Sequence, residues 1–339
     1  MATNADIAKA AGVSPAIVSR IVNGDKTLRV SAETRARVLR HIQEMDYSPN
    51  VAARSLKASS TGVIALIVHD LTSSVYAEII AGAHEAALAY GKAVLVGEAN
   101  ESASGQSHLE DLVAGRGVDG IILQGAGTRF DRTLERAARH GVPTVLLQAG
   151  DPLTNRVVRL DDEAAGRVAT EHLLSLGHTH IGYIGVADEL LFSGDRKHGW
   201  QRALADAGIE PQDGWSTDGG NKFAPGADAI RELLRRDPQL TGVVVANVAS
   251  AIGVSAALQD LGKRIPDDFS MIAVHDIPLA DYLRPALTVI RMPLRQLGSV
   301  AIEEVTGGGT TPGVVCVDGA GPELIERAST APVRRYDAL

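Results

Sequence analysis

From residue 63 onward, short apolar runs alternate with longer segments of helical character. The runs are rich in Val, Ile and Leu at successive positions, which is typical of strands in a parallel sheet covered by helices on both faces. The runs that we expect to form strands are residues 63–68, 93–98, 120–124, 144–148, 181–185, 242–247 and 270–274. The helices expected between them include residues 76–90, 163–176, 200–207 and 251–261.

This region spans about 280 residues, more than one sheet usually occupies, so we expect two α/β lobes. In such sheets ligands bind at the carboxyl ends of the strands. The full chain of 339 residues also has room for a small additional domain at its start. The first residues lack the basic start and apolar run of a signal peptide, and no stretch reaches ~18 uninterrupted apolar residues, so we expect a cytoplasmic protein.

The chain begins with a group of short predicted helices. Thr3 is expected to cap a helix over residues 4–11, with Asp6 completing a capping-box contact. Gly12 permits a sharp turn, after which Ser14 and Pro15 suit the N-cap and first position of a second helix. Ser31 is expected to cap a third helix that ends near residue 45. The side chains expected to point inward are Ile7, Ala8, Ala11, Val13, Ile17, Val18, Ile21, Val38, Leu39, Ile42 and Met45.

The outer face of the second helix carries Pro15, Ala16, Ser19 and Arg20. Small residues let a helix enter a groove deeply, a serine can reach a phosphate, and arginine reads guanine bidentately. Residues 1–60 hold nine Lys/Arg and five Asp/Glu although the whole chain has a net charge of −8, so a basic head precedes an acidic body. This combination indicates a helix-turn-helix for double-stranded DNA. The alternative is a three-helix cap that packs on the main domain.

Residues 48–60, with the sequence SPNVAARSLKASS, form a separate segment. Ser48 and Pro49 end the preceding helix, and the helix-forming residues that follow are too few for a stable isolated helix in water. We expect this segment to be disordered until a partner holds it. The alternative is a plain linker.

Three segments, DIAKAAGVSPAIVSRIVNG, VSAETRARV and MDYSPNVAARSLK, resemble the DNA-binding head of the lactose-repressor (LacI/GalR) family. The resemblance implies that Pro15, Ala16 and Arg20 choose base pairs. It implies a hinge helix that folds when two copies pair in the minor groove, where Leu56 enters a central base step. The DNA-binding residues expected are Thr3, Ser14, Pro15, Ala16, Ser19, Arg20, Asn23, Asn50, Arg54, Leu56 and Lys57, of which Ser14, Ser19 and Asn23 would hold the backbone and Arg54 and Lys57 the phosphates or groove rim.

The body resembles the effector domain of the same family in RVATEHLLSLGHTHIGYIG, HGWQRALADAGI, VVVAN, DIPLA, RPALTVIRMPLRQLG and PELIERAST. The implied fold class is an N-terminal all-α helix-turn-helix head plus an α/β two-lobed periplasmic-binding-protein-like effector domain. The implied chain crossings lie near Leu160, Arg291 and Gly321. The expected parts are a head (1–47), a hinge (48–60), an N-terminal lobe (61–160 plus 292–321) and a C-terminal lobe (161–291 plus 322–339).

The resemblance also implies an effector site in the cleft between the lobes, where Arg196 matches an effector-binding arginine whose planar fork grips a diol or carboxylate. Several positions depart from the family pattern. Val248 and His275 stand where acids are usual, Gln148 where aspartate is frequent, and His69 where proline is common. The effector-binding residues expected are His69, Tyr76, Gln148, Asp161, Arg196, Asn221, Asn247 and His275.

Fewer carboxylates beside Arg196 would make the local potential positive, since hexose sites usually use carboxylates to accept from hydroxyls. This favours an acidic or modified sugar over a neutral hexose. Dyad-related heads would form a homodimer on a pseudo-palindromic operator, in a cytoplasmic, nucleoid-associated protein. The C-terminal residues show no leucine heptad of the kind that forms tetramers.

Signals for catalysis are missing from the sequence. It contains no GxSxG, HExxH or Walker motif and no GxGxxG after a strand, so we expect neither enzyme activity nor a cofactor. His178 and His180 do not form a metal site, and His178 is expected to end a helix against its dipole. Cys316 is the single cysteine, which excludes an internal disulfide. Two alternatives remain. An enzyme with an accessory head would need one of these motifs, and a solute-binding receptor would need a signal peptide; the sequence shows neither.

Overall fold

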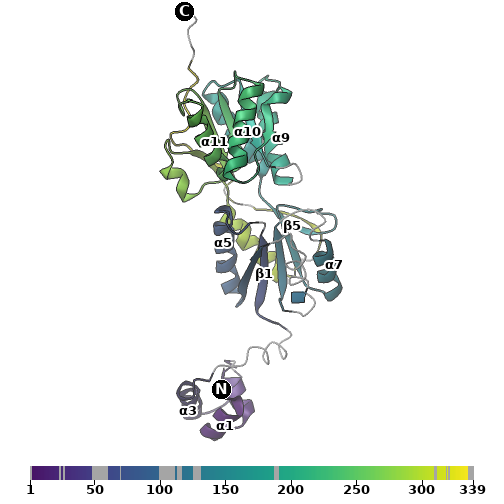
Figure 1. Ribbon diagram of the computed structural model, residues 1–339. Helices are drawn as coiled ribbons and strands as arrows, with labels where there is room; N and C mark the ends of the chain where they lie inside the picture. Colours follow the sequence, from purple (N-terminus) through teal and green to yellow (C-terminus); the bar gives the residue numbers. More distant parts are fainter. Residues whose placement is uncertain are drawn as a thin grey trace, which may run out of the picture. The chain divides into compact units, whose positions relative to one another are not determined.

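The structure of the protein, a computed structural model, describes residues 2–22, 24–25, 27–47, 60–68, 70–98, 111–112, 117–124, 131–186, 191–308, 311–317, 319 and 321–334. The chain divides into two compact units, Met1–Thr61 and Gly62–Leu339, which we treat separately (Figure 1). Most of the predicted hinge, residues 48–59, lies outside the described residues. So do six predicted site residues: Asn23, Asn50, Arg54, Leu56, Lys57 and His69.

The described part of the first unit contains helices α1 (Asn4–Ala11), α2 (Pro15–Val22) and α3 (Ala32–Glu44). The capping box predicted at α1 is confirmed. The Thr3 hydroxyl accepts from the Asp6 N–H at 3.3 Å, and the Asp6 carboxylate accepts from the Thr3 N–H at 2.8 Å. Gly12 ends α1 with φ +65°, in the left-handed region that favours glycine. The sequence therefore places the α1–α2 corner correctly.

The core of this unit is small and centred on Ile7, Val18 and Val38, each of which is fully buried. The prediction was wrong for Leu39 and Met45, whose side chains are 46% and 37% exposed. Helix α3 packs against α1 and α2 along one narrow stripe, so a residue next to Val38 points outward, and Met45 already belongs to the helix cap.

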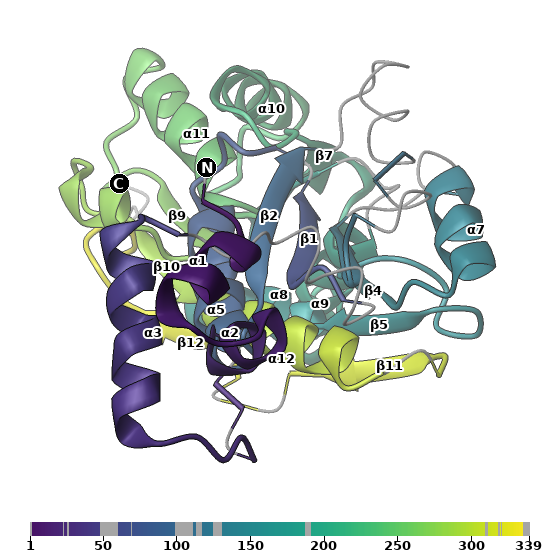
Figure 2. The same ribbon diagram turned by 90° about the horizontal axis from the view of Figure 1, so that it is seen from below.

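Six of the described strands form a parallel sheet in the N-terminal lobe, in the order β11-β5-β4-β3-β1-β2. Their bounds are β1 (Val63–Val68), β2 (Ala93–Glu98), β3 (Gly120–Gln124), β4 (Thr144–Leu147), β5 (Arg156–Arg159) and β11 (Gly313–Cys316). Side chains alternate across the sheet. Ile64 and Leu66 belong to the cluster that includes α5 (Val75–Ala89) and α12 (Leu294–Thr306), whereas Ala65 and Ile67 pack with Ala137 of α7 (Asp131–His140). Figure 2 shows α7 on one side of these strands and α5 and α12 on the other.

A second group of six described strands forms the sheet of the C-terminal lobe, in the order β12-β10-β9-β8-β6-β7. The strands are β6 (Ile181–Gly185), β7 (Ser216–Asp218), β8 (Gly242–Val245), β9 (Ser270–Val274), β10 (Thr288–Arg291) and β12 (Glu323–Ile325), of which β12 is antiparallel to β10. The helices of this lobe are α8 (Asp162–Ser175), α9 (Leu191–Asp206), α10 (Phe223–Arg236) and α11 (Val248–Asp260). Every residue of β6, β8 and β9 is buried, so helices must cover both faces.

All of the strands predicted from long apolar runs are present. The prediction missed β5, β7, β10, β11 and β12, which are three or four residues long. All but β11 lack a sustained apolar run, and the run of β11, residues 314–317, was overlooked. It also began α9 nine residues late, because Ser193, Gly194 and Asp195 make its first turns polar. Among the helices of the described residues, none combines the length and apolar character needed to cross a bilayer.

The chain passes repeatedly between the two sheets. It leaves the first sheet between β5 and α8, returns between β10 and α12, and crosses again between β11 and β12. The carboxyl ends of strands from both sheets therefore lead into crossing segments, and these segments border the space between the lobes.

Glycines bring three pairs of helices into close contact. A Cβ on Gly82 of α5 would overlap the Arg295 carbonyl of α12, and one on Gly298 of α12 would overlap the Ile79 carbonyl of α5. The same reciprocal arrangement relates α8 to α9 and α10 to α11, through Gly166 with Gly199 and through Gly226 with Gly253. Each pair thus packs backbone against backbone at a distance that any side chain would prevent.

The end of the described chain is held against the C-terminal lobe by buried polar groups. His178 Nε2 lies 3.0 Å from the Ala331 carbonyl and Nδ1 lies 2.9 Å from the Thr241 hydroxyl, while His172 Nε2 lies 2.9 Å from the Thr330 hydroxyl. The expectation that His178 ends a helix was wrong, since α8 ends at Ser175 and the ring points into the lobe. Its two nitrogens instead connect the strands to the C-terminal segment.

A glycine substitution tests the helix contacts. We expect Gly199→Ala to lower the free energy of unfolding by about 1–3 kcal/mol, because the new methyl group has no space against the α8 backbone. Gly194→Ala, in the same helix but with no neighbour at its Cβ position, should be neutral or stabilising by up to about 1 kcal/mol. Urea unfolding monitored by circular dichroism measures both; equal effects would contradict the packing argument.

Stability should also depend on pH through the buried histidines. Burial lowers the pKa of His172 and of His178 below the ordinary 6.5, so both rings are neutral in the folded chain. The unfolded chain binds more protons below pH 6.5, so the free energy of unfolding should fall there by at most about 1.4 kcal/mol per pH unit per histidine. Thermal unfolding between pH 7.5 and about 5 should show a smaller slope for His178→Gln and an unchanged slope for the exposed control His140→Gln.

Candidate functional site

A pocket lies between the two lobes and is lined by residues of both. The space between its walls, together with the part open to solvent, is about 800 Å³. The N-terminal lobe contributes Ser73, Val75, Tyr76, Ile79, Gln124, Gln148, Leu294 and Leu297, and the C-terminal lobe contributes Val186, Phe192, Arg196, Asn221, Asn247, Ala249 and His275. A small molecule in this pocket would therefore contact both lobes at once.

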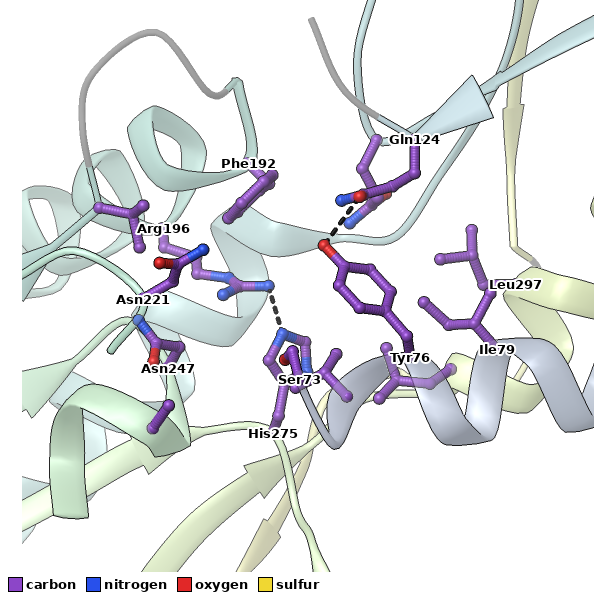
Figure 3. Close-up of a pocket in the computed structure, with 15 residues that line it drawn as sticks. Ser73, Tyr76, Ile79, Gln124, Phe192, Arg196, Asn221, Asn247, His275 and Leu297 are labelled. Atoms are coloured by element: carbon purple, nitrogen blue, oxygen red, sulfur yellow. Dashed lines mark hydrogen bonds between the residues drawn. The ribbon is translucent and has the colours of Figure 1, made fainter. Parts of the chain in front are cut away.

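The side of the pocket formed by α5 and α12 is mostly apolar. Ile79 and Leu297 are buried and face the pocket beside Tyr76 (Figure 3). The Tyr76 hydroxyl donates a hydrogen bond of 2.7 Å to Gln124 Oε1 at the end of β3, which orients the tyrosine ring. Burial raises the pKa of Tyr76 well above its usual value, so the phenol stays protonated. This side can accept the nonpolar flank of a ligand.

The opposite side is built around Arg196, which is only 1% exposed. Its Nε donates to Asp162 at 2.8 Å, and its Nη2 lies 2.7 Å from the same carboxylate oxygen. Its Nη1 donates to the Ala246 carbonyl at 2.5 Å, and the Phe192 ring lies 5.1 Å from the guanidinium. The guanidinium is thus fixed in orientation by partners on α8 and α9 and by the residue that follows β8.

The Asp162 carboxylate links the two lobes. Its second oxygen accepts a hydrogen bond of 2.6 Å from Gln148 Nε2, and the Leu160 N–H donates to Gln148 Oε1 at 2.6 Å. Gln148 follows β4 of the first sheet, whereas Asp162 is the first residue of α8. Burial raises the pKa of Asp162, and Arg196 and Gln148 oppose that rise with charge and hydrogen bonds. Because both oxygens accept N–H groups, the carboxyl is ionised and neutralises Arg196.

His275 completes the polar side. Its Nε2 lies 3.0 Å from Arg196 Nη2, and its Nδ1 is buried without a hydrogen-bond partner in the described part of the chain. Burial, with a further contribution from the Arg196 charge, lowers the pKa of His275 well below 6.5, so the ring is neutral. Its backbone φ of 78° lies in the left-handed region, as does that of Gln148 at 57°. Both strained residues line this pocket, and such strain often marks functional sites.

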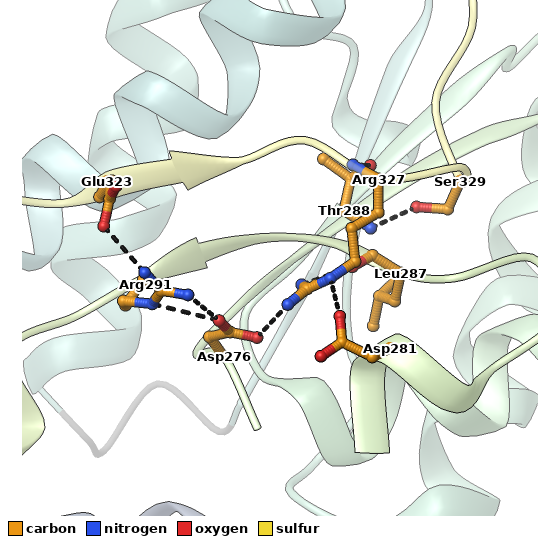
Figure 4. Close-up of polar contacts among 8 residues, drawn as sticks. All are labelled: Asp276, Asp281, Leu287, Thr288, Arg291, Glu323, Arg327 and Ser329. Carbon is orange, nitrogen blue, oxygen red and sulfur yellow. Dashed lines mark hydrogen bonds and ion pairs between the residues drawn. The ribbon is translucent and has the colours of Figure 1, made fainter. Parts of the chain in front are cut away.

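A network of charges holds the segment that carries His275 (Figure 4). The Asp276 carboxylate accepts from Arg291 at 2.7 Å and from Arg327 at 2.9 Å. Arg327 also donates to Asp281 at 2.5 Å, and Arg291 reaches Glu323 at 3.2 Å. The network joins the end of β9 to β10 and β12, and this connection keeps the residue after His275 in place.

In the first unit, the exposed face of α2 forms a second candidate site. Pro15, Ala16 and Arg20 are exposed on it, and Ser14 Oγ accepts from the Ile17 N–H at 3.4 Å at its start. Arg20 donates to Asp25 at 2.6 Å and to the Thr27 hydroxyl at 3.0 Å. Hydrogen bonds from Thr27 and Arg20 lower the pKa of Asp25 to about 2. These contacts hold the guanidinium beside the helix face.

Comparisons with known proteins identify the family of both parts of the chain. Residues 3–50 match the family of "bacterial regulatory proteins, lacI family", and residues 61–314 match "periplasmic binding proteins and sugar binding domain of LacI family". The regulator GalS of Salmonella typhimurium is 31% identical over 333 residues, covering 98% of this chain and 97% of that protein. The chain belongs to the lacI family. Catabolite control protein A of Priestia megaterium is likewise 31% identical, over 89% of this chain and 90% of its own length.

Solved structures agree with this lacI-family membership. A lac repressor dimer bound to operator and the anti-inducer ONPF has a TM-score of 0.85 and 25% identity, covering 97% of this chain and 99% of that one. The CelR–cellobiose complex has a TM-score of 0.72 and 27% identity, over 97% of this chain and 100% of that one. The predicted fold class is therefore confirmed. The lacI-family description names regulatory proteins and GalS is named a transcriptional regulator, in agreement with the regulatory function predicted from the sequence.

Most of the predicted effector residues that the structure describes come together. Tyr76, Gln148, Arg196, Asn221, Asn247 and His275 all line the pocket. The amide of Asn247 is already engaged, because Oδ1 accepts from the Ser250 N–H and Nδ2 donates to the Gly220 carbonyl. Asn247 therefore caps α11 at the pocket wall.

Asp161 does not line the pocket. It is exposed and caps α8 by accepting from the Ala164 N–H at 2.9 Å, while its neighbour Asp162 points inward. The sequence analysis missed Asp162, and nothing in two adjacent aspartates distinguishes the buried one. The argument that Arg196 makes the pocket electropositive was wrong, because Asp162 neutralises it. Within the described residues, no three His, Cys, Asp or Glu side chains are placed to hold a metal ion.

The ion pair between Arg196 and Asp162 leads to a stability prediction. Asp162→Asn should lower the free energy of unfolding by about 3–5 kcal/mol, because it leaves a buried guanidinium without its counter-ion. Asp161→Asn is the matched control, since asparagine caps a helix as well as aspartate and should change stability by less than about 0.5 kcal/mol. Urea unfolding separates the two; a loss confined to Asp161→Asn would contradict the assignment of the buried partner.

Proposed function

We propose that this lacI-family protein is a repressor that binds a pseudo-palindromic operator as a homodimer and is controlled by a small molecule in the interlobe pocket. The observation that carries the proposal is the exposed α2 face with Pro15, Ala16 and Arg20 on a stable three-helix core. Helix α2 enters the major groove, where Arg20 reads a guanine and the small residues permit close approach. The protein acts in the cytoplasm, associated with the nucleoid.

The proposed parts of the chain follow the sequence boundaries. Residues 1–47 are the head and residues 48–60 the hinge. Residues 61–160 plus 292–321 and residues 161–291 plus 322–339 are the two lobes. The passage of the chain between the two sheets supports the last two boundaries. In the hinge, Leu56 enters the minor groove of a bent operator while Arg54 and Lys57 contact phosphates. The remaining DNA contacts are those of Thr3, Ser14, Ser19, Asn23 and Asn50.

The effector is a sugar or a sugar derivative. This proposal is supported by the polar and apolar sides of the pocket and by the relatives, which include the CelR–cellobiose complex and an Enterococcus faecium regulator with bound ribose. Tyr76, Gln148, Arg196, Asn221, Asn247 and His275 form the site, together with His69. An effector changes the arrangement of the lobes only to the extent that it binds the two conformational states of the lobes with different affinities. The changed arrangement alters the spacing of the paired hinges.

The test is the affinity of the chain for a palindromic duplex selected from a random-sequence pool. Arg20→Ala should weaken binding by roughly 10–100-fold, because a bidentate arginine–guanine contact is worth about 1–3 kcal/mol. Fluorescence anisotropy over a range of salt concentrations measures the affinity and the number of phosphate contacts.

Arg235→Ala is the control for this test, because it removes an exposed arginine of α10 that lies outside the first unit. It should leave operator affinity within about twofold. Full operator affinity in a combined Arg20→Ala, Leu56→Ala variant would contradict the proposed function.

A further inference from the structure

His275 carries the clearest unmet hydrogen-bonding capacity in the pocket. Arg196 Nη2 can only donate, so His275 Nε2, 3.0 Å away, must be the acceptor. A neutral imidazole then carries its proton on Nδ1. This Nδ1 is buried and has no partner in the described part of the chain, although the residue lines the pocket and is only 6% exposed. A buried donor without an acceptor is unfavourable unless a ligand or water satisfies it.

The acceptor oxygens of Asp162, Gln148 and Asn247 are already engaged. Both Asp162 oxygens accept N–H groups from Arg196 and Gln148, and Gln148 Oε1 accepts from the Leu160 N–H. On the same side, Asn247 Oδ1 accepts from the Ser250 N–H. A ligand hydroxyl could accept from His275, but its own hydrogen would then need a further acceptor, such as Ser73 Oγ or Asn221 Oδ1 in the pocket lining. A carboxylate or carbonyl oxygen accepts the hydrogen bond from His275 Nδ1 and has no hydrogen that would itself need an acceptor.

The charge of Arg196 does not explain this preference, because Asp162 neutralises the guanidinium inside the protein. What the pocket offers at this position is one unmatched N–H donor rather than net positive charge. The relevant property of a ligand is therefore the acceptor oxygen that it presents, and this oxygen can belong to an anion or to a neutral carbonyl group.

The position of the His275 ring is determined by its surroundings. The His275 N–H donates to the Ile290 carbonyl at 2.8 Å, and the following Asp276 is held by Arg291 and Arg327. These contacts maintain the left-handed φ of 78° at His275. Histidine, asparagine and aspartate adopt this conformation more readily than most residues, so they can be exchanged here with the least strain.

We propose that His275 is a specificity-determining residue whose Nδ1–H selects effectors that place a carboxylate or carbonyl oxygen beside it. The proposal rests on the proposed function of the pocket as the effector site. It names the class of ligand as a sugar acid, lactone or keto sugar, in contrast to a sugar that presents only hydroxyl groups at this position. The apolar side formed by Ile79 and Leu297 then covers the opposite flank of the molecule.

The first experiment requires no ligand. The full chain, labelled with ¹⁵N-histidine, is studied by long-range ¹H–¹⁵N correlation NMR at pH 7, with His275→Asn used to assign the resonance. The expected result is a neutral ring protonated on Nδ1. A ring protonated on Nε2, or on both nitrogens, overturns the proposal.

The second experiment compares matched ligands by calorimetric titration of the full chain. The probes are D-glucuronate, D-glucurono-6,3-lactone, D-gluconate and D-galacturonate, with D-glucose and D-galactose as the neutral partners. At least one acid or lactone should bind ten or more times more tightly than its neutral partner. Equal or tighter binding of the neutral sugars, or no binding by any probe, overturns the ligand class.

Two isosteric variants then test the residue itself with the best probe. His275→Asn keeps an N–H near the position of Nδ1 and should bind within fivefold of the parent. His275→Asp replaces the donor with an anionic acceptor and should bind at least fiftyfold more weakly. Equal affinities of the two variants overturn the role of the donor, and thermal unfolding verifies that both are folded. Operator binding, measured on the same parent preparation, shows independently whether the proposed function holds when the ligand class fails.

Discussion

The buried ion pair between Arg196 and Asp162 determines the geometry of the interlobe pocket. An arginine that is almost completely buried is tolerated only when its donors are matched, and here α8, β8 and His275 supply the partners. The pair requires α8 and α9 to approach closely, which Gly166 and Gly199 allow because a side chain on either would overlap the other backbone. The close packing of α8 against α9 is therefore what brings the charged groups of the pocket together.

The local features of the head could be predicted from sequence because each depends on neighbouring residues. Thr3 with Asp6, Gly12, and Ser14 with Pro15 determine the helix ends, and the structure has those ends where the residues indicate. The exposure of Leu39 could not be predicted in this way. Whether a residue beside the inward stripe is covered depends on the angle at which α3 meets its neighbours, and this is a property of the tertiary structure.

The same distinction applies to the body. Long apolar runs such as residues 120–124 identified the central strands, but β7 and β12 are stabilised mainly by their neighbours in the sheet. The glycines of the helix pairs lower the helix propensity of their segments, so the sequence alone counts against them. Their role in close packing can be recognised only when the partner helix is in place. In the pocket, Arg196 and His275 could be identified from sequence. Their connection through Asp162 to Gln148 could not, because it joins residues of both lobes.

The order of the strands also bears on how the protein forms during synthesis. One face of the first sheet is covered by Leu297, Ala301 and Ile302 of α12, and its edge strand β11 ends at Cys316. Strands β1 to β5 thus leave the ribosome long before the α12 part of their cover is made, while the contiguous head can fold at once. Until α12 has emerged, the part of this face that α5 does not cover remains open to association with other nascent chains, so a chaperone that binds it would have most of the translation time in which to act.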